Sequence, residues 1–474
     1  MGNKRQVYLL DPQEYSPETI AVAFAKTSRS PESFRQIAAE LNGTKSAEFN
    51  EKWVVGYGHS SVAEHAVLHI AVENTSRLAC ECLESNRLAS FTEKSTRYQT
   101  WDVDAFYIPE ELKPSQLLPE YVETCQFLLN TYQSIIPAVI AHLAKENPLS
   151  ADEKQSAWER RIRGLAIDNC RFLLPSAVLA NVGVTINARA LEHALAKMLS
   201  HPLEEVRQIG AEIKVCATKS VPTLLKYAGA DESLMTAILP VSSPNLPTIS
   251  PEHDWCQLIY SEQNLENRIL AAYYYRLHEI SYAQSLEWIH QASSTEKTRL
   301  AGMLLQVKNP HSDPLRELEH VYFTFDVLLD QGAYYEVKRH RMMTLTPQTL
   351  TSRQGYALPK AIVHADQEEL FCKAMAQARE TYCHLADQFP FVASYVVPNA
   401  FNRRFLLTAN LRSLFHFIQL RSAPNAHFSV RRFAQRLSNE LNNVLPEFSQ
   451  YLPVNHLESE TQIESTFFTE TMRG

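Results

Sequence analysis

The chain has 474 residues, of which 45% are hydrophobic and 21% are charged, and its formal net charge is −8 at pH 7. Because this length exceeds what one ordinary hydrophobic core supports, we expect two or three domains. The acidic balance argues against general nucleic-acid binding, which requires a basic surface. An anionic small molecule would therefore have to be held by a local cluster of basic residues.

Cysteine and glycine usage excludes further classes of site. The eight cysteines form no CxxC pair, so neither a zinc site nor a disulfide framework is predicted. The 12 glycines include no GxxxxGK[ST] motif, and Gly56-Tyr57-Gly58 lacks the third glycine of the dinucleotide fingerprint. A bound nucleotide would therefore have to be held by side chains.

Targeting signals are not evident. The start of the chain lacks the apolar core of a signal sequence, and no apolar run has the length that a membrane span needs. We therefore expect a cytoplasmic protein that has no membrane partner.

The first half alternates strand and helix patterns. A strand-like opening at residues 7–10 precedes helical segments that end near residue 42. The alternation of residues 65–73 predicts a strand, and Ser76 is placed to cap a helix that runs through residue 88. The expected sequel is a polar loop (87–98), helices with proline-containing joints (109–165), an apolar stretch (171–179), a strand that leads into a helix (183–200), and a further helix (204–227).

Three histidines in this half, His59, His65 and His69, raise the question of a metal site. Two of them lie on the alternating strand, and no carboxylate falls at a recognised ligand spacing. No metal site is predicted.

A proline-rich segment separates the two halves. Residues 240–251 contain four prolines and are predicted to be an interdomain linker between residues 1–239 and residues 252–474. Beyond it the same order of elements returns. His311 and Glu319-His320 lead an alternating strand, a helix reaches Arg341, and a polar loop follows.

One motif indicates an internal duplication. Asn187-x-Arg189-x-x-x-His193 recurs as Asn410-x-Arg412-x-x-x-His416, at an offset of 223 positions. The strand-leading His65 and His320 lie 255 positions apart, so the first half carries about 32 extra residues between these points.

The segment of residues 336–341, Glu-Val-Lys-Arg-His-Arg, is the strongest candidate for ligand binding. Two arginines flank a histidine where a predicted helix meets a polar loop. The guanidinium group presents a rigid fork of donors that matches phosphate and carboxylate groups. A damaged copy of the same segment occurs in the first half.

With these motifs, both halves resemble the flavin-dependent thymidylate synthase family, whose signature is Arg-His-Arg-x-x-Ser-x-Asn-Glu-x-Ser-x-Arg-Tyr. The second half keeps Arg339, His340 and Arg341, but Pro347 stands where the signature has Glu. In the first half the signature survives at Arg87, Ser90, Glu93, Ser95, Arg97 and Tyr98, whereas Ser85, Asn86 and Thr92 depart from it. The resemblance implies an α+β fold in two tandem copies, each a mainly antiparallel sheet with flanking helices.

The losses in the two halves are complementary. In the family, one subunit gives a helix-end Gln-x-x-Arg and a late helical Arg, and another gives the Glu-x-Ser-x-Arg loop and a strand-start Arg. The resemblance thus implies one composite nucleotide site, with Glu336 in place of the family's Gln. Its members are Glu336, Arg339 and Arg421 from the second half, and Glu93, Lys94, Ser95, Thr96, Arg97 and Arg171 from the first. The reciprocal set, with Ser85, Met198, Pro347 and Ser394, is expected not to hold a nucleotide phosphate.

The resemblance also implies an activity. A family member uses FAD, with NADPH and methylenetetrahydrofolate as co-substrates, to methylate carbon 5 of deoxyuridylate. Arg339, Arg97 and Arg171 would bind phosphate, and Arg421 would act in catalysis by stabilising negative charge on the pyrimidine ring. Candidates for the flavin site are Ser61, Glu93, Asn187, Arg189, His193, Arg339, His340, Arg341, Asn410, Arg412 and His416.

Because the family builds its flavin pocket from four copies of the fold, two chains are expected to form a homodimer that is a pseudo-tetramer, with about one flavin per chain. Two alternatives stay open. The chain could be a related flavoenzyme acting on a different nucleotide, or a catalytically silent nucleotide- or flavin-binding paralogue.

Overall fold

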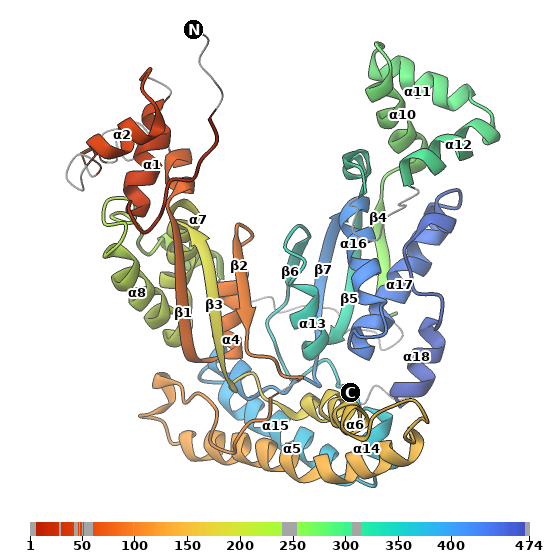
Figure 1. Ribbon diagram of the computed structural model, residues 1–474. Helices are drawn as coiled ribbons and strands as arrows, with labels where there is room; N and C mark the ends of the chain where they lie inside the picture. The colour runs from red at the N-terminus through yellow and green to blue at the C-terminus, as the bar shows by residue number, and fades with distance from the viewer. Residues whose placement is uncertain are drawn as a thin grey trace. The chain divides into compact units, whose positions relative to one another are not determined.

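The computed structural model describes residues 6–27, 30–41, 46, 48–49, 51, 60–97, 99–238, 254–305 and 314–469 (Figure 1). Contacts divide the chain into two compact units. Unit 1 comprises Met1–Ser95, Ala105–Leu118 and Ala177–Leu246, and unit 2 comprises Thr96–Asp104, Pro119–Ser176 and Pro247–Gly474. Unit 2 therefore includes two segments of the first sequence repeat.

These units differ from the expected repeat boundaries at residues 1–239 and 252–474, which stay a prediction. The expected linker, residues 240–251, lies outside the described residues. The same holds for the Gly56-Tyr57-Gly58 motif and for His59, Tyr98 and His311.

Unit 1 is built on a three-stranded antiparallel sheet of order β1-β3-β2. One face is buried, because Val182, Val184 and Ile186 alternate along β3 with more exposed residues. The strands are β1 (Val67–Ser76), β2 (Ala89–Glu93) and β3 (Leu179–Asn187), and the helices that contact them or one another include α4 (Arg77–Glu84), α7 (Ala188–Leu199) and α8 (Glu204–Thr218).

Unit 2 contains a four-stranded antiparallel sheet of order β4-β5-β7-β6. Phe323, Phe325 and Phe405 place large aromatic side chains in its core, against Phe433 and neighbouring helical residues. The strands are β4 (Cys256–Ser261), β5 (Tyr322–Asp330), β6 (Thr344–Pro347) and β7 (Asn402–Asn410), and the helices nearest them are α13 (Gln331–Val337), α16 (Leu411–Arg421) and α17 (Phe428–Val444).

The register shows that the two sheets are copies of one arrangement. Val67 lies opposite Asn187 in unit 1, and Tyr322 lies opposite Asn410 in unit 2. Each asparagine then caps the helix that follows its strand, accepting a hydrogen bond from the backbone nitrogen three residues later. The expected α+β fold in two tandem copies is confirmed.

Equivalent segments of the two repeats pair with each other inside unit 2. Ser176 N donates to Val397 O and Asn399 N donates to Leu174 O, both at 3.0 Å, and Pro175 bridges Pro398. At an offset of 223 positions, Ser176 is equivalent to Asn399 and Leu174 is equivalent to Val397, so the two hydrogen bonds are reciprocal like those of a twofold dimer.

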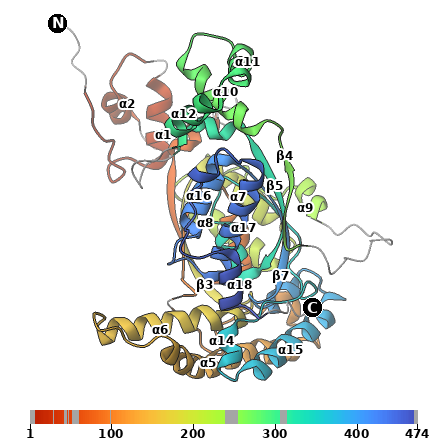
Figure 2. The same ribbon diagram turned by 90° about the vertical axis from the view of Figure 1, so that its right-hand side faces the viewer.

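Helices from both repeats also pack together in unit 2. The helices α5 (Leu118–Glu146), α6 (Gln155–Cys170), α14 (Lys360–His364) and α15 (Glu368–Ala386) lie side by side in both views (Figures 1 and 2). Thr124 of α5 and Thr381 of α15 share a buried hydrogen bond of 2.8 Å. Contrary to the sequence expectation, α5 has the length and apolar composition that a membrane span needs. In the structure its buried stripe packs as a core helix.

The other helices lie mainly toward the N-terminal part of each repeat or at the C-terminus. They are α1 (Pro17–Lys26), α2 (Phe34–Glu40), α9 (Glu232–Ile238), α10 (Leu265–Leu277), α11 (Tyr282–Gln291), α12 (Ser294–Leu305) and α18 (Glu460–Phe467), with short 3₁₀ turns that include η3 (Ser60–His65), η5 (Arg171–Leu173) and η6 (Arg316–His320).

Several sequence expectations about single elements are wrong. Residues 7–10 form no strand, and Val7 and Leu9 are 91% and 92% exposed. The helix capped by Ser76 ends at Glu84 instead of residue 88, and α8 ends at Thr218. Each expected polar loop contains a short strand, β2 in the first half and β6 in the second. These strands form because pairing with β3 and β7 satisfies their backbone N–H and C=O groups, although the local sequence is polar.

The cap of α4 gives a prediction about stability. Ser76 Oγ accepts from Ala79 N at 2.9 Å and donates to the buried Glu205 at 2.5 Å, whereas the cap Ser459 of α18 is exposed. We expect Ser76→Ala to lower the free energy of unfolding by about 2 to 4 kcal/mol, because it removes a cap and a donor to a buried carboxylate.

The control Ser459→Ala should cost only about 1 kcal/mol, since it removes a cap alone. Denaturant unfolding of both variants measures the difference. Equal losses of unfolding free energy in the two variants would show that the hydrogen bond from Ser76 to Glu205 adds nothing beyond the helix cap.

Candidate functional site

Glu336 forms the centre of a buried cluster in unit 2. It lies in the last turn of α13 and is 8% exposed. Its Oε1 accepts from Arg171 Nη2 at 2.9 Å, and its Oε2 accepts from Arg421 Nη1 at 3.1 Å. One carboxylate thus bridges two guanidinium groups that come from the two sequence repeats. We call these three residues the triad.

Arg171 is held in place mainly through its backbone. It begins η5, directly after α6, and its carbonyl oxygen accepts from Asn399 Nδ2 at 3.0 Å. Its Nη1 reaches Thr96 Oγ1 at 3.4 Å. Its Nε is buried and has no hydrogen-bond partner among the described residues. The guanidinium group is therefore only partly satisfied by the protein.

The three side-chain nitrogen atoms of Arg421 all lie near Glu336 or His340. Besides Nη1, its Nη2 lies 3.4 Å from Glu336 O, and its Nε donates to His340 Nε2 at 2.9 Å. His340 must therefore carry its proton on Nδ1. Burial, and next the charge of Arg421, lower the pKa of His340 to about 3, so the ring is neutral at physiological pH.

The charge state of Glu336 follows from its partners. Burial by itself would raise the pKa of Glu336, but the positive charges of Arg171 and Arg421 outweigh burial and lower this pKa to about 2. The carboxylate is ionised, and it neutralises part of the positive charge of the two arginines.

A second ion pair lies beside the triad. Arg97 donates to both oxygens of Asp168, at 2.8 and 2.6 Å, and its Nη1 donates to Asn425 O at 2.8 Å. The charges of Arg339 and Arg97 lie near enough to Arg421 to lower its pKa, after the larger effect of burial. Unit 2 thus gathers four of the predicted arginines, of which Arg171 and Arg421 bond to Glu336 and Arg97 bonds to Asp168.

The fully buried His427 completes this region. Its Nε2 donates to Asp168 O at 3.0 Å, and its Nδ1 accepts from Ser429 N. Burial, followed by the charge of Arg171, holds the pKa of His427 well below its ordinary value. The imidazole is therefore a neutral structural contact between α6 and α17.

The sequence did not point to three residues of this cluster: Asp168, Asn399 and His427. Asp168 lies in the last turn of α6, three residues before Arg171, a spacing that places the two on neighbouring positions and could have been noticed. Asn399 and His427 carry no local signal, because tertiary contacts alone bring them to Arg171 and Asp168.

The other predicted substrate residues belong to unit 1, which we describe by itself. Glu93 forms a buried ion pair of 3.2 Å with Arg77. Lys94 N donates to Asn181 O at 2.9 Å, which extends β2 against β3, and Ser95 follows it. Their part in a nucleotide site stays a prediction.

The flavin candidates of the two repeats show matching local contacts. Arg189 pairs with Glu64 of η3, and Arg412 pairs with Glu319 of η6 at 3.0 Å. Asn187 and Asn410 are helix caps. The rings of His340 and His416 lie 5.8 Å apart in unit 2. Ser61 lies in η3, His193 lies on α7, and Arg339 and Arg341 follow the end of α13.

Among the described residues, the members of the reciprocal set make contacts of other kinds. Ser394 Oγ, at the position equivalent to Arg171, donates to Leu350 O at 2.8 Å. Met198, at the position equivalent to Arg421, is a buried core residue of unit 1. Ser85 Oγ bonds to Cys82 O, and Pro347 ends β6.

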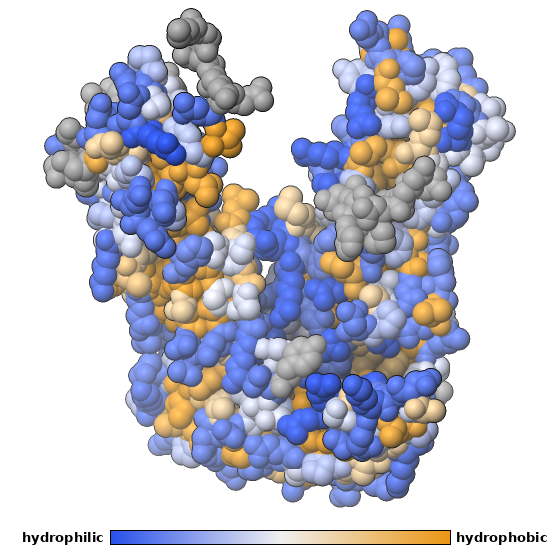
Figure 3. Space-filling view, viewed as in Figure 1, coloured by the Kyte–Doolittle hydropathy of each residue, from blue (hydrophilic) through white to orange (hydrophobic). Residues whose placement is uncertain are grey.

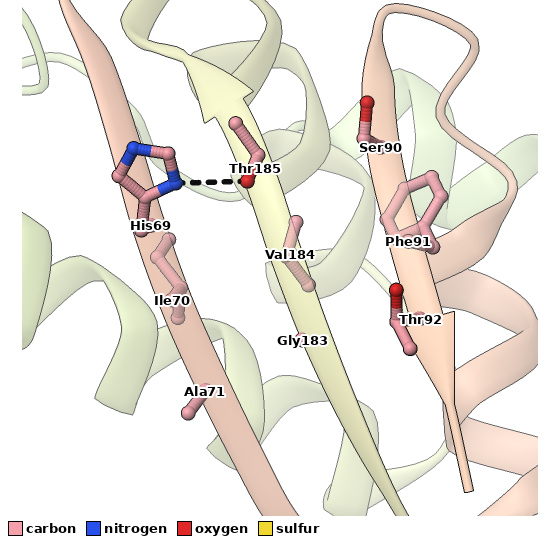
Figure 4. Close-up of a pocket in the computed structure, with 9 residues that line it drawn as sticks. All are labelled: His69, Ile70, Ala71, Ser90, Phe91, Thr92, Gly183, Val184 and Thr185. Atoms are coloured by element: carbon pink, nitrogen blue, oxygen red, sulfur yellow. Dashed lines mark hydrogen bonds between the residues drawn. The ribbon is translucent and has the colours of Figure 1, made fainter.

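A separate hollow of about 350 Å³ lies on the exposed face of the sheet of unit 1 (Figure 4). His69 Nδ1 and Thr185 Oγ1 are 2.9 Å apart across it, and the rest of its lining is apolar or hydroxyl-bearing. Figure 3 shows apolar side chains at the surface around these strands. None of the predicted site residues lines this hollow. Across the described residues, no group of three histidine, cysteine or acidic side chains is arranged to hold a metal.

Comparisons with known proteins find relatives of both repeats. The family described as "Thymidylate synthase complementing protein" matches residues 10–223 and again residues 258–447. A "UPF0159 protein" of Chlamydia muridarum is 30% identical over 436 residues, which are 87% of this chain and 82% of that protein. A "UPF0159 protein" of Thermoplasma acidophilum is 27% identical over 86% of this chain and 89% of its own length.

Shorter relatives match part of the chain. A flavin-dependent thymidylate synthase of Clostridium tetani is 27% identical over 45% of this chain and 83% of its own length. A crystal structure of a flavin-dependent thymidylate synthase from Helicobacter pylori, complexed with FAD and dUMP, is 19% identical over 42% of this chain and 99% of its own, with a TM-score of 0.33.

The triad predicts a pH dependence of stability. The pKa of Glu336 is about 2 in the folded chain against an ordinary value of 4.5. Such a carboxylate stabilises the fold fully above pH 4.5 and loses this contribution as the pH falls toward 2. Between these limits the parent should lose roughly 3 kcal/mol more than Glu336→Gln, which cannot titrate there.

Denaturant unfolding of both proteins at intervals from pH 6 to pH 2 measures this difference. Parallel curves for the two proteins would mean that Glu336 is not held ionised by the arginines.

Proposed function

Because the chain belongs to the thymidylate synthase complementing protein family, which includes the flavin-dependent thymidylate synthases, we propose that it is a flavin-dependent methyltransferase acting on a pyrimidine nucleotide at one composite site per chain. The one-carbon unit would come from methylenetetrahydrofolate and the reducing equivalents from NADPH. The acceptor would be deoxyuridylate or a closely related nucleotide.

The arginine cluster of unit 2 is the observation that carries this proposal. Arg171 and Arg421 share the one carboxylate of Glu336, and the charges of Arg339 and Arg97 also act on Arg421. Two guanidinium groups that share one carboxylate suit a phosphate monoester, which is close to a dianion at neutral pH. In a chain with a net charge of −8, such a concentration of arginine needs a local reason.

Arg421 is the proposed catalytic residue. In the family role it faces the pyrimidine, where a fixed positive charge stabilises the negative charge that develops on the ring. Its partner His340 is neutral and accepts its Nε proton, so His340 orients the guanidinium group without competing for charge. No cysteine nucleophile is needed in this proposal.

The flavin would be FAD, held by residues of several copies of the fold. His340 and His416 offer flat rings and hydrogen-bonding nitrogens 5.8 Å apart between centroids, and Arg412 lies one turn before His416 on α16. These residue types suit an aromatic cofactor with phosphate groups. Bound FAD would supply the reducing chemistry. Glu93, Ser61, Arg339, Arg341, Asn187, Arg189, His193 and Asn410 complete the proposed flavin set.

A second candidate function has an observation in its favour. Glu336 already occupies two of the arginines, so the chain could be a paralogue that binds a flavin or nucleotide without turning it over. Tritium release from deoxyuridylate labelled at carbon 5, measured with NADPH and methylenetetrahydrofolate, distinguishes the two, since only the methyltransferase releases tritium.

The composite site predicts coupled losses of nucleotide binding. Arg171→Ala and Arg421→Ala should each weaken deoxyuridylate binding about ten- to a hundredfold, because each removes a charge-assisted contact to the same ligand. The double variant should lose less than the sum of the two free-energy changes, since the residues share Glu336 as well as the ligand. Calorimetric titration measures all three.

Controls come from the reciprocal set. Ser394→Ala and Met198→Leu should bind like the parent. Leucine is used at position 198 because truncating this buried side chain would leave a cavity. Arg171→Lys, which keeps a positive charge, checks whether a loss of binding in Arg171→Ala comes from misfolding. If Arg171→Ala binds deoxyuridylate like the parent while Arg421→Ala does not, the composite site is wrong.

The assembly gives a further prediction. The family needs four copies of the fold around its flavins and one chain has two, so we expect a flavin-loaded homodimer, a pseudo-tetramer, with about one FAD per chain. Sedimentation followed at the flavin absorbance measures mass and stoichiometry together. A stable flavin-loaded monomer, or two tight flavins per chain, would contradict this expectation.

A further inference from the structure

One member of the triad, Glu336, is itself an anion that pairs with both arginines. Each oxygen of Glu336 accepts from a different arginine, 2.9 Å from Arg171 Nη2 and 3.1 Å from Arg421 Nη1. This arrangement is the one that a bound carboxylate or phosphate would adopt between two guanidinium forks. A side chain of the protein therefore stands where a ligand oxyanion would be expected.

The position of Glu336 makes it a persistent competitor. It is 8% exposed and is fixed by the last turn of α13, whose first turn is capped by Asp330 and contacts Asn399 through Gly332 N. A Cβ at Gly332 would lie 3.2 Å from Asp330 Oδ1 and 3.4 Å from Asn399 Cβ, so this end of the helix is closely packed. The carboxylate is thus presented to the arginines by a rigid element.

Two arginine atoms show that the carboxylate does not satisfy the cluster completely. Arg171 Nε is buried without a partner among the described residues, and Arg171 Nη1 makes only a long contact of 3.4 Å to Thr96 Oγ1. A larger oxyanion with three acceptor oxygens would satisfy more donors than one carboxylate does. Such a ligand and Glu336 would still repel each other if both stayed at the site.

We propose that Glu336 is an internal competitor for the phosphate of the ligand, and that it sets how tightly the site holds a nucleoside monophosphate. This inference rests on the proposed function, because it takes Arg171 and Arg421 as the ligand's phosphate and ring contacts. Glutamine at this position would keep the size of the side chain and a hydrogen bond to one arginine, but it would release the positive charge to the ligand.

The test compares phosphate-bearing and phosphate-free probes. Titrating Glu336→Gln with deoxyuridylate should show binding about ten- to a hundredfold tighter than in the parent, because a charge-assisted contact is freed for the ligand. Deoxyuridine, which lacks the phosphate, should gain much less affinity from this substitution than deoxyuridylate does. A change in folding would alter both probes, so the contrast between them isolates the phosphate.

The control is Glu153→Gln, which breaks the ion pair of 2.7 Å with Arg161 elsewhere in unit 2 and changes the net charge by the same amount. It should bind deoxyuridylate like the parent. If Glu336→Gln does not fold, Glu336→Asp replaces it. This shorter anion cannot reach both arginines from the same backbone position, so deoxyuridylate should again bind more tightly than in the parent.

The outcomes separate the two proposals. If the parent binds deoxyuridylate and Glu336→Gln binds it no more tightly, the competitor role is wrong while the nucleotide site stands. If Glu336→Gln loses affinity for deoxyuridine, Glu336 contacts the sugar or base, which also overturns the competitor role. If neither protein binds deoxyuridylate or inorganic phosphate, the proposed nucleotide function fails as well.

Discussion

The reciprocal backbone pairing of Leu174, Pro175 and Ser176 with Val397, Pro398 and Asn399 is the constraint on which the site depends. It fixes a segment of one repeat against the equivalent segment of the other. Because Asn399 bonds both to the carbonyl of Arg171 and to the start of α13, this pairing sets the position of Arg171 relative to Glu336. A contact between two distant parts of the chain thus becomes a rigid geometry for two charged side chains.

The charge balance of the cluster decides what it can bind. A buried Arg171 and a half-buried Arg421 without a counter-ion would be costly, and Glu336 lowers that cost by pairing with both. The same pairing reduces the attraction for a phosphate. The cluster is therefore a compromise between the stability of the empty fold and the affinity for an anion, and the neighbouring Arg97–Asp168 pair shows the same balance on a smaller scale.

The two copies differ in their site residues far more than in their scaffolds. Register, asparagine caps and the pairs Arg189–Glu64 and Arg412–Glu319 recur in both. These contacts maintain a sheet and its following helix in each copy. By contrast, the positions equivalent to Arg171 and Arg421 are occupied by Ser394 and Met198 in the other copy. The scaffold contacts thus recur in both copies, whereas the proposed composite site uses one arginine set.

The sequence by itself determined the repeated order of elements, the helix cap at Ser76, and the complementary arginine sets, because each depends on residue types at short or regular spacing. Strands β2 and β6 were missed, since their backbone groups are satisfied by β3 and β7 and not by local preference. The tertiary structure alone decided that Glu336 meets two arginines, that Asn399 bonds to the backbone of Arg171, and that Asp168 bonds to Arg97 and His427. Such contacts join residues that are far apart in the chain, and no local pattern encodes which donor a buried carboxylate will find.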